Sequence, residues 1–249
     1  VTPDSFSDGG RHDTHEAAIA HGLALVEAGA DVLDVGGEST RPGAQDVDEA
    51  DELDRVLPVV EGLVARTGVP VSIDTSKPEV MRAAVAAGAG MINDVFALRR
   101  EGALEAAAEA GVPVVLMHMQ GEPRSMQQAP HYTDVVAEVS AFLADRVAAC
   151  RAAGIPEASI LVDPGIGFGV NTAESLAMIR CLTALKAFGL PVLVGPSRKR
   201  FIGEILKAPV EERLLGTAAA VAVSIAHGAD FVRVHDVRQM ADVVKVADA

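Results

Sequence analysis

The chain has 249 residues, of which 49% are hydrophobic, and it carries a formal net charge of −14. This length and apolar content suit one large α/β domain over residues 1–249, because barrels often run to this size without a break. The acidic balance argues against a nucleic-acid partner, since it would repel a phosphate backbone. No apolar stretch approaches the roughly 20 residues that span a bilayer, so no membrane partner is expected.

The cysteine content and the early sequence bear on the compartment. Cys150 and Cys181 are the only cysteines and are too few for a disulfide framework, which favours a reducing environment. None of the early segments resembles a signal peptide. The cytoplasm is therefore the expected compartment. The sequence begins at Val1 rather than at a methionine, and we expect further residues before it.

Helical and extended patterns alternate along the chain. Ile19, Leu23 and Val26 follow helical spacing, with Thr14 as a candidate N-cap and Gly29 as a stop. Two further helical patterns are a segment at 53–64 and a short one after Pro78, and a fourth lies at 214–225. Apolar runs that predict strands lie at 32–35, 71–73, 91–92, 114–117, 160–162, 192–194 and 231–234.

The order of these patterns predicts a parallel sheet covered by helices. Seven strand-and-helix units are visible, and residues 2–10 are typical of the loop after an eighth strand, which would lie before Val1. Eight units close a barrel. We therefore predict a TIM (β/α)8 barrel whose first strand is truncated or missing, with a doubly wound open sheet as the alternative.

Each apolar run stops at polar or charged residues, and in such folds active sites form at the carboxyl ends of the strands. Asp74 and Asp163 each end a nearly apolar strand, where an unpaired carboxylate would lose much of its hydration. An ion pair or a helix cap would satisfy each one. Together with Asn93 and Lys199, however, they offer alternating acceptors and donors, which suits a flat heterocycle with several N–H and C=O groups.

The last two loops of the predicted barrel carry a basic group. Barrels of this class often bind phosphate in these loops, which here bring Ser197, Arg198, Lys199, Arg233 and His235. A phosphorylated ligand is therefore expected. Arg198 and Arg200, taken singly, could equally be solvated surface charges.

Other motifs are less specific. Gly165, Gly167 and Gly169 do not have the spacing of a dinucleotide fingerprint, so they either let the backbone approach a ligand, beside Phe168, or form an ordinary turn. Metal-dependent hydrolysis is not expected, because the metal-binding histidine pairs are absent from the sequence. His118 and Met117 taken alone suit the core. Asp4 and Asp8 could hold a hard cation such as Mg²⁺ on phosphate oxygens.

Seven segments together resemble the dihydropteroate synthase family. They are TPDSFSDGG (2–10), GGESTRPG (36–43), SIDT (72–75), IND (92–94), DPGIGFG (163–169), SRK (197–199) and RVHDV (233–237). The resemblance implies a cytosolic TIM barrel, usually a homodimer, that joins 6-hydroxymethyl-7,8-dihydropterin diphosphate to 4-aminobenzoate. Diphosphate is released in this step of folate synthesis, and sulfonamides compete at the aminobenzoate site.

The resemblance also implies roles for individual residues. Asp74, Asn93, Asp163 and Lys199 would bind the pterin, with Met117 against its ring. Arg233 and His235 would bind the diphosphate and, with Lys199, form the catalytic group. The remaining implied contacts are Thr40 near the diphosphate, Arg41, Pro42 and Phe168 at the aminobenzoate, and Asp8 at Mg²⁺.

The sequence departs from the family in three places. The family's metal-binding asparagine would precede Val1, Val170 replaces a frequent lysine, and Arg200 replaces a frequent serine near the aminobenzoate carboxylate. These changes could alter activity or affinity for substrate and sulfonamide.

Three competing interpretations are a Schiff-base aldolase that uses Lys199 or Lys77, a methyltetrahydrofolate-binding barrel of the corrinoid methyltransferases, and a paralogue that binds pterin without turnover.

Overall fold

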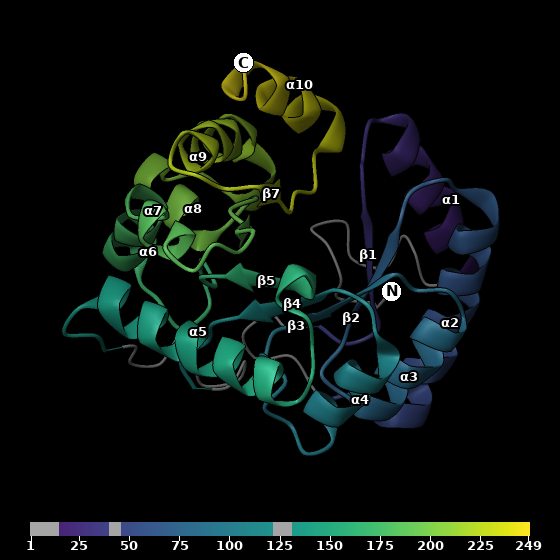
Figure 1. Ribbon diagram of the computed structural model, residues 1–249. Coiled ribbons are helices and arrows are strands. Elements are labelled where there is room, and N and C mark those ends of the chain that lie inside the picture. Colours follow the sequence, from purple (N-terminus) through teal and green to yellow (C-terminus); the bar gives the residue numbers. More distant parts are fainter. Residues whose placement is uncertain (1–14, 40–45, 122–130) are drawn as a thin grey trace.

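The computed structural model describes residues 15–39, 46–121 and 131–249 (Figure 1). Strands and helices alternate along these segments. The strands are β1 (Leu33–Gly36), β2 (Val71–Asp74), β3 (Met91–Asp94), β4 (Val114–Met117), β5 (Ile160–Asp163), β6 (Leu193–Val194) and β7 (Phe231–Val232). The helices are α1 (His15–Glu27), α2 (Glu49–Arg66), α3 (Pro78–Ala86), α4 (Ala103–Ala110), α5 (Val135–Ala152), α6 (Thr172–Arg180), α7 (Thr183–Lys186), α8 (Arg200–Leu206), α9 (Leu214–Ala226) and α10 (Val237–Ala247).

The strands are parallel and lie in sequence order. β1 to β5 form one sheet, β6 pairs with β7, and a bridge between Val162 and Val192 joins the two groups. The helices surround the strands (Figure 1). This is the arrangement of a TIM barrel, as predicted. In the described ranges no strand pairs with both β7 and β1, which is where the expected eighth strand would lie.

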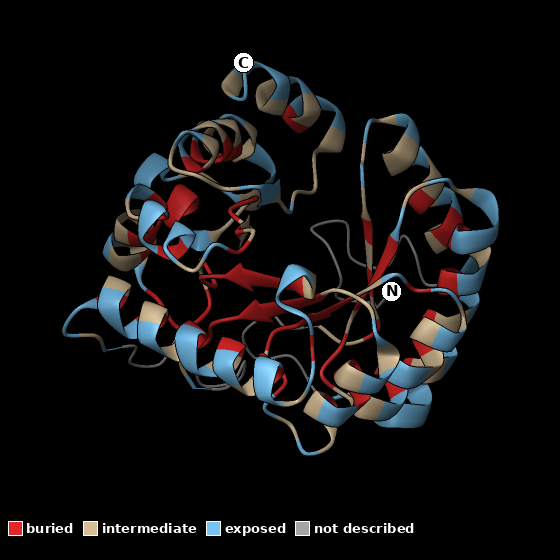
Figure 2. Cartoon of the chain, viewed as in Figure 1, coloured by how far each residue is buried: buried red, intermediate tan, exposed pale blue. Residues whose placement is uncertain are grey.

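The main hydrophobic core lies between the strands and the inner faces of the helices, where the buried residues gather (Figure 2). Ile73, Ile92, Leu116 and Ile160, from four neighbouring strands, are completely buried. Parallel strands are covered on both faces, which explains why the sequence shows them as continuous apolar runs. The predicted strands consequently agree with the observed ones to within two residues at each end.

Local signals in the sequence place the helix ends. Asp48 caps α2 by accepting a hydrogen bond from the N–H of Asp51 at 2.8 Å, and α2 continues through Pro58. α1 ends before Gly29, whose φ of 105° is left-handed, and Pro78 opens α3 as expected. None of the described helices combines the length and the apolar content needed to cross a membrane.

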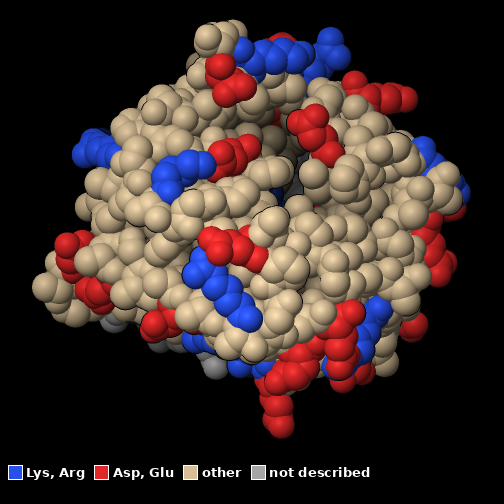
Figure 3. Space-filling model, in the orientation of Figure 1, with Lys and Arg blue, Asp and Glu red and all other residues tan. Residues whose placement is uncertain are grey.

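Figure 3 shows the surface in the same orientation as Figure 1. The surface is hollowed between the part formed by β7 and α10 and the part formed by α1 and β1, and acidic side chains flank this hollow (Figure 3). The interval between β7 and β1 in the barrel is thus visible at the surface.

Candidate active site

The predicted pocket residues lie at the carboxyl ends of neighbouring strands. Asp74 ends β2 and is in register with Asn93 of β3, and Met117 ends β4 in register with Asp163 of β5. Because the strands are parallel, all four residues lie at the same edge of the sheet. The structure therefore brings together residues that are far apart in the sequence.

Arg233, which follows β7, reaches two carboxylates on the other side of the interval between β7 and β1. Its Nε lies 2.7 Å from Oδ2 of Asp34, and its Nη2 donates to Oδ2 of Asp74 at 2.8 Å. Asn93 donates to the same oxygen of Asp34 through Nδ2 at 3.0 Å. One guanidinium thus connects the chain after β7 to β1 and β2, and Asn93 extends the network to β3.

Asp34 is a site residue that sequence analysis missed. It lies within the apolar run 32–35, and its neighbours Leu33 and Val35 are buried while Asp34 is half-buried. Side chains alternate between the two faces of a strand, so Asp34 faces the barrel side together with the pocket residues. The available signal was a carboxylate inside an apolar strand, which requires a partner for the same reason as Asp74.

Burial raises the pKa of two pocket carboxyl groups. Desolvation raises the pKa of Asp74 to about 7, although Arg233 opposes this shift. Desolvation also raises the pKa of Asp163 to about 6, against the backbone N–H of Gly165 and the charges of Lys199 and Arg233. The pKa of Arg233 is lowered by burial, but the three carboxylates around it outweigh that effect and raise it. The pocket therefore combines a permanent cation with carboxyl groups that titrate close to neutral pH.

Lys199 lies beside the pocket and faces an aromatic ring. Its Nζ is 3.9 Å from the centroid of the Phe168 ring, a cation–π contact. Phe168 belongs to a small apolar cluster that includes Met117 and Met119. The positive charge of Lys199 also acts to lower the pKa of Asp163. The amine thus lies between the Phe168 ring and Asp163.

His235 and Ser197 form a second polar group next to Arg233. Nδ1 of His235 lies 2.9 Å from Oγ of Ser197, and the backbone N–H of His235 donates to the same Oγ at 3.2 Å. Burial and, to a lesser extent, the cations Arg198, Arg233 and Lys199 together lower the pKa of His235 to about 4, while Asp236 opposes them. The imidazole is therefore neutral at pH 7.

The two arginines that flank Lys199 differ. Arg198 binds Asp236 through two contacts, Nη2 to Oδ1 at 2.6 Å and Nε to Oδ2 at 3.0 Å. Its side chain is only 22% exposed, so the interpretation of Arg198 as a solvated surface charge is wrong. Arg200 is 68% exposed and pairs with Glu204 one turn along α8, and for this residue the surface interpretation is correct.

The glycines after β5 are required by the fold of the chain itself. Gly165, Gly167 and Gly169 all have left-handed φ values, of 71°, 82° and 68°. A Cβ on Gly165 would lie 1.8 Å from the carbonyl oxygen of His118, and one on Gly169 would lie 2.6 Å from the carbonyl oxygen of Gln120. Of the two interpretations of this motif, the tight turn is therefore the one that the described contacts explain.

Two other buried polar residues belong to the interior of the fold. Asp94 accepts hydrogen bonds from the backbone N–H groups of Phe96 and Leu98, both at 2.8 Å. His118 is buried and packs edge-on against Phe142, with the ring centroids 5.0 Å apart. Burial lowers the pKa of His118 to about 4. His118 is thus a neutral core histidine, as its sequence context suggests.

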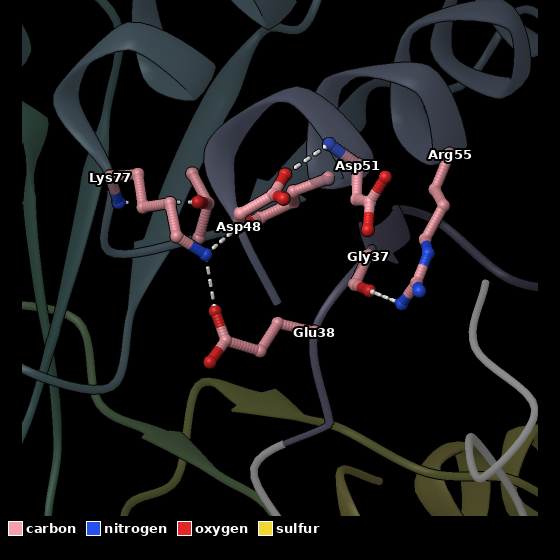
Figure 4. Close-up of polar contacts among 8 residues, drawn as sticks. Gly37, Glu38, Asp48, Asp51, Arg55 and Lys77 are labelled. Carbon is pink, nitrogen blue, oxygen red and sulfur yellow. Dashed lines mark hydrogen bonds and ion pairs between the residues drawn. The ribbon is translucent and has the colours of Figure 1, made fainter. Parts of the chain in front are cut away.

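A buried charge cluster, formed by Glu38, Glu52 and Lys77, holds the chain where it leaves β1 (Figure 4). The ammonium group of Lys77 donates to carboxylates of both glutamates, and Glu52 is almost completely buried on α2. Arg55 adds a second tie, because its Nη1 donates to the carbonyl oxygen of Gly37 at 2.9 Å (Figure 4). The chain after β1 is therefore fixed both to α2 and to the start of α3.

This cluster bears on the aldolase interpretation. Burial lowers the pKa of Lys77, but its two carboxylate partners outweigh burial and raise it above the usual value. A lysine that forms a Schiff base must lose its proton readily. Lys77 is consequently unsuited to that chemistry.

Some residues singled out in the sequence lie outside the described residues, namely the candidate N-cap Thr14 and the predicted site residues Asp4, Asp8, Thr40, Arg41 and Pro42. Within residues 15–39, 46–121 and 131–249, no group of three or more His, Cys, Asp or Glu side chains could hold a metal ion.

Comparison with known proteins identifies the class first. Residues 1–235 match the family model described as pterin binding enzyme. The chain is 49% identical to the dihydropteroate synthase of Escherichia coli strain K12, over 100% of this chain and 88% of that protein. It is 45% identical to the dihydropteroate synthase of Synechocystis, over 100% of this chain and 87% of that protein.

Solved structures give the same result. The Yersinia pestis dihydropteroate synthase with a sulfonamide drug complex superposes with a TM-score of 0.97 at 46% identity, covering 100% of this chain and 90% of that one. The Xanthomonas albilineans dihydropteroate synthase in complex with 7,8-dihydropteroate has a TM-score of 0.89 at 53% identity, covering 100% of this chain and 89% of that one. The chain belongs to the dihydropteroate synthase family.

The glycine turn gives a first prediction. Gly165→Ala should destabilise the protein by at least about 3 kcal/mol, because a left-handed alanine is strained and its Cβ would overlap the His118 carbonyl. Gly189→Ala is the matched control, since Gly189 has a φ of 70° but nothing near its Cβ position, and it should cost only about 1–2 kcal/mol. Urea unfolding of both variants measures the difference, and equal losses would contradict the proposed clash.

The charge cluster gives a second prediction. Lys77→Met should lower the free energy of unfolding by about 3–5 kcal/mol, because it leaves the buried carboxylate of Glu52 and the partly buried one of Glu38 without their cation. Adding Glu52→Gln to this variant should recover part of the loss. Lys186→Met is the control, because the exposed Lys186–Asp230 pair should contribute less than about 1 kcal/mol. Similar unfolding midpoints for Lys77→Met and Lys186→Met would argue against the cluster's importance.

Proposed function

We propose that this chain condenses 6-hydroxymethyl-7,8-dihydropterin diphosphate with 4-aminobenzoate to give 7,8-dihydropteroate and diphosphate. This makes it a transferase of folate biosynthesis and a target for sulfonamides. The observation that carries the proposal is the Arg233-centred network at the barrel mouth, in which Arg233 contacts Asp34 and Asp74 while Asn93 and Asp163 lie beside it. The full-length similarity to dihydropteroate synthases supports the same reaction.

The pocket residues suit a pterin ring. Asp163 and Asp74 would accept hydrogen bonds from ring N–H and amino groups, and Asn93 and Lys199 would donate to ring nitrogen and carbonyl oxygen. Met117 and Phe168 belong to the apolar cluster beside them and would contact the flat faces of the substrates. The alternation of donors and acceptors favours a heterocycle over a simple carboxylic acid or sugar.

The basic residues would act on the leaving group. The C–O bond of the exocyclic methylene breaks, its electron pair leaves on the diphosphate, and the electron-rich dihydropterin ring stabilises the resulting carbocation. The aniline nitrogen then forms the new C–N bond and loses a proton to solvent. Arg233, Lys199 and His235 would stabilise the charge that develops on diphosphate, and such pre-positioned donors often contribute several kcal/mol.

Several further features belong to this proposal. Thr40 would contact the diphosphate end, and Arg41, Pro42 and Phe168 the aminobenzoate. Mg²⁺ would be held by Asp8 together with substrate oxygens, and it would neutralise charge on the diphosphate.

We also propose a single cytoplasmic domain, consistent with two free cysteines, that assembles as a homodimer. Exposed apolar side chains on α8 and α9, Ile205, Leu206 and Leu215, support self-association.

The proposal is tested by a diphosphate-release assay on the chain with its native N-terminus, with both substrates and Mg²⁺. Release that requires 4-aminobenzoate and is inhibited by a sulfonamide is the expected result. Pterin binding without release would indicate a binding protein, and lysine trapping by borohydride with a carbonyl substrate would indicate an aldolase.

Asp163→Asn should abolish pterin binding, because an amide that replaces the carboxylate presents a donor where the ring also presents donors. Titration calorimetry with the pterin diphosphate measures this. Asp94→Asn is the matched control, because Asp94 is a buried carboxylate that caps its own loop; it should lower stability while leaving pterin affinity largely intact. Wild-type affinity in Asp163→Asn would refute the assigned role.

Pterin affinity should also depend on pH. Because burial raises the pKa of Asp163 to about 6, this carboxyl becomes protonated below that pH and must lose its proton to accept from the ring. Asp74, with a pKa of about 7, must be ionised for the same reason, so the association constant should be nearly constant well above pH 7, fall below it as Asp74 is protonated, and fall more steeply than tenfold per pH unit below pH 6. Calorimetry across this range checks the slope, and a pH-independent affinity would contradict it.

A further inference from the structure

Ser197 has no role in the proposed reaction so far, yet it makes two contacts with one proposed catalytic residue. Ser197 follows β6, His235 follows β7, and the serine side chain is almost completely buried. Its Oγ lies 2.9 Å from Nδ1 of His235 and accepts the backbone N–H of the same histidine at 3.2 Å. The hydroxyl therefore contacts both the backbone and the ring of His235.

The position of the protons follows from what each group can donate. A serine hydroxyl has one proton to donate and two lone pairs, and a neutral imidazole has one N–H. If Nδ1 carried the ring proton, the serine proton would need a second acceptor, and the hydrogen bonds found among the described residues give it none. If the serine donates to Nδ1, the serine proton has an acceptor and the ring proton resides on Nε2.

The charges around the ring keep it neutral. Arg198, Arg233 and Lys199 all disfavour a second proton, and burial disfavours it as well. Asp236 is the acidic group that opposes them, but both of its carboxylate oxygens are bound by Arg198. His235 is therefore a neutral ring with a single N–H, and which nitrogen carries that N–H decides where it can donate.

A different role for the pair can be set aside. In a serine hydrolase the histidine faces the serine through Nε2, and Nδ1 is held by a carboxylate. Here Nδ1 faces the serine, and the neighbouring Asp236 pairs with Arg198 instead. Ser197 is thus arranged to donate to the histidine rather than to lose its proton to it.

We propose that Ser197 is a positioning residue that holds His235 as the Nε2–H tautomer, so that the neutral ring donates this N–H to an oxygen of the departing diphosphate. The role rests on the proposed function. It makes His235 a directional hydrogen-bond donor, while Arg233 and Lys199 supply the positive charge. Without the serine, the neutral ring would distribute its proton over both nitrogens and lose its fixed orientation.

Nitrogen-15 NMR of the full chain with labelled histidine tests the tautomer directly, and His235→Gln identifies the signal. The expected spectrum has an unprotonated Nδ1 and a protonated Nε2 in the wild type, and a shift toward a mixture of tautomers in Ser197→Ala. A wild-type ring protonated on Nδ1 overturns the proposal, whether or not the chain catalyses the condensation. Failure of the condensation with the expected tautomer present would instead count against the proposed function.

A binding experiment tests the consequence. Ser197→Ala should weaken binding of inorganic diphosphate, with Mg²⁺ present, about tenfold while leaving the affinity for 6-hydroxymethylpterin unchanged, and Ser197→Thr should restore it. Ser224→Ala is the matched control, because Ser224 is also buried but donates to a helix carbonyl at 2.7 Å; both affinities should stay at the wild-type level. Equal diphosphate affinity in Ser197→Ala and the wild type overturns the proposal, and parallel losses for both ligands would show a merely structural role.

Discussion

The barrel mouth depends on the two ion pairs that Arg233 makes with Asp34 and Asp74. Carboxylates within or at the end of buried strands lose hydration, and a buried charge left without its partner typically costs about 3–5 kcal/mol. Arg233 offsets this cost for both aspartates at once and also acts on Asp163. Because it extends from β7 to β1 and β2, the same contact connects the two strands between which the described residues provide no further strand. The charge that we propose acts on the leaving group thus also connects β7 to β1 and β2.

One cation lies between two carboxylates at two places among the described residues, at Lys77 and at Arg233. The two groups differ in how far they are exposed. At Lys77 the cation and its partners are almost enclosed, the lysine side chain being 12% exposed, so the group cannot exchange partners without exposing buried charge. The Arg233 side chain is 45% exposed, so an incoming anion can reach it and replace a carboxylate. Exposure, rather than residue type, therefore separates the structural cluster from the group that we propose binds diphosphate.

The barrel could be predicted from the sequence because each strand is covered on both faces and forms a continuous apolar run with a polar stop. The same rule located Asp74, Asn93 and Asp163, which are the stops. The rule does not find Asp34, because this residue lies inside an apolar run. Its charge within that run was the one sign in the sequence that it needs a partner. The roles of Arg198 and of the glycines depend on contacts between distant segments, Arg198 with Asp236 and Gly165 with His118, which spacing along the chain does not encode.

In the proposed function, the two halves of the substrate act oppositely on the two carboxyl groups that titrate near neutral pH. Pterin N–H groups that donate to Asp163 favour its ionised form, so ring binding lowers the pKa of that residue. A diphosphate that draws Arg233 away from Asp74 removes the cation that opposes its burial, so the pKa of Asp74 rises above about 7. The two carboxyl groups thus respond to the substrate in opposite directions, because Asp163 would contact the ring whereas the charge of Asp74 depends on its ion pair with Arg233.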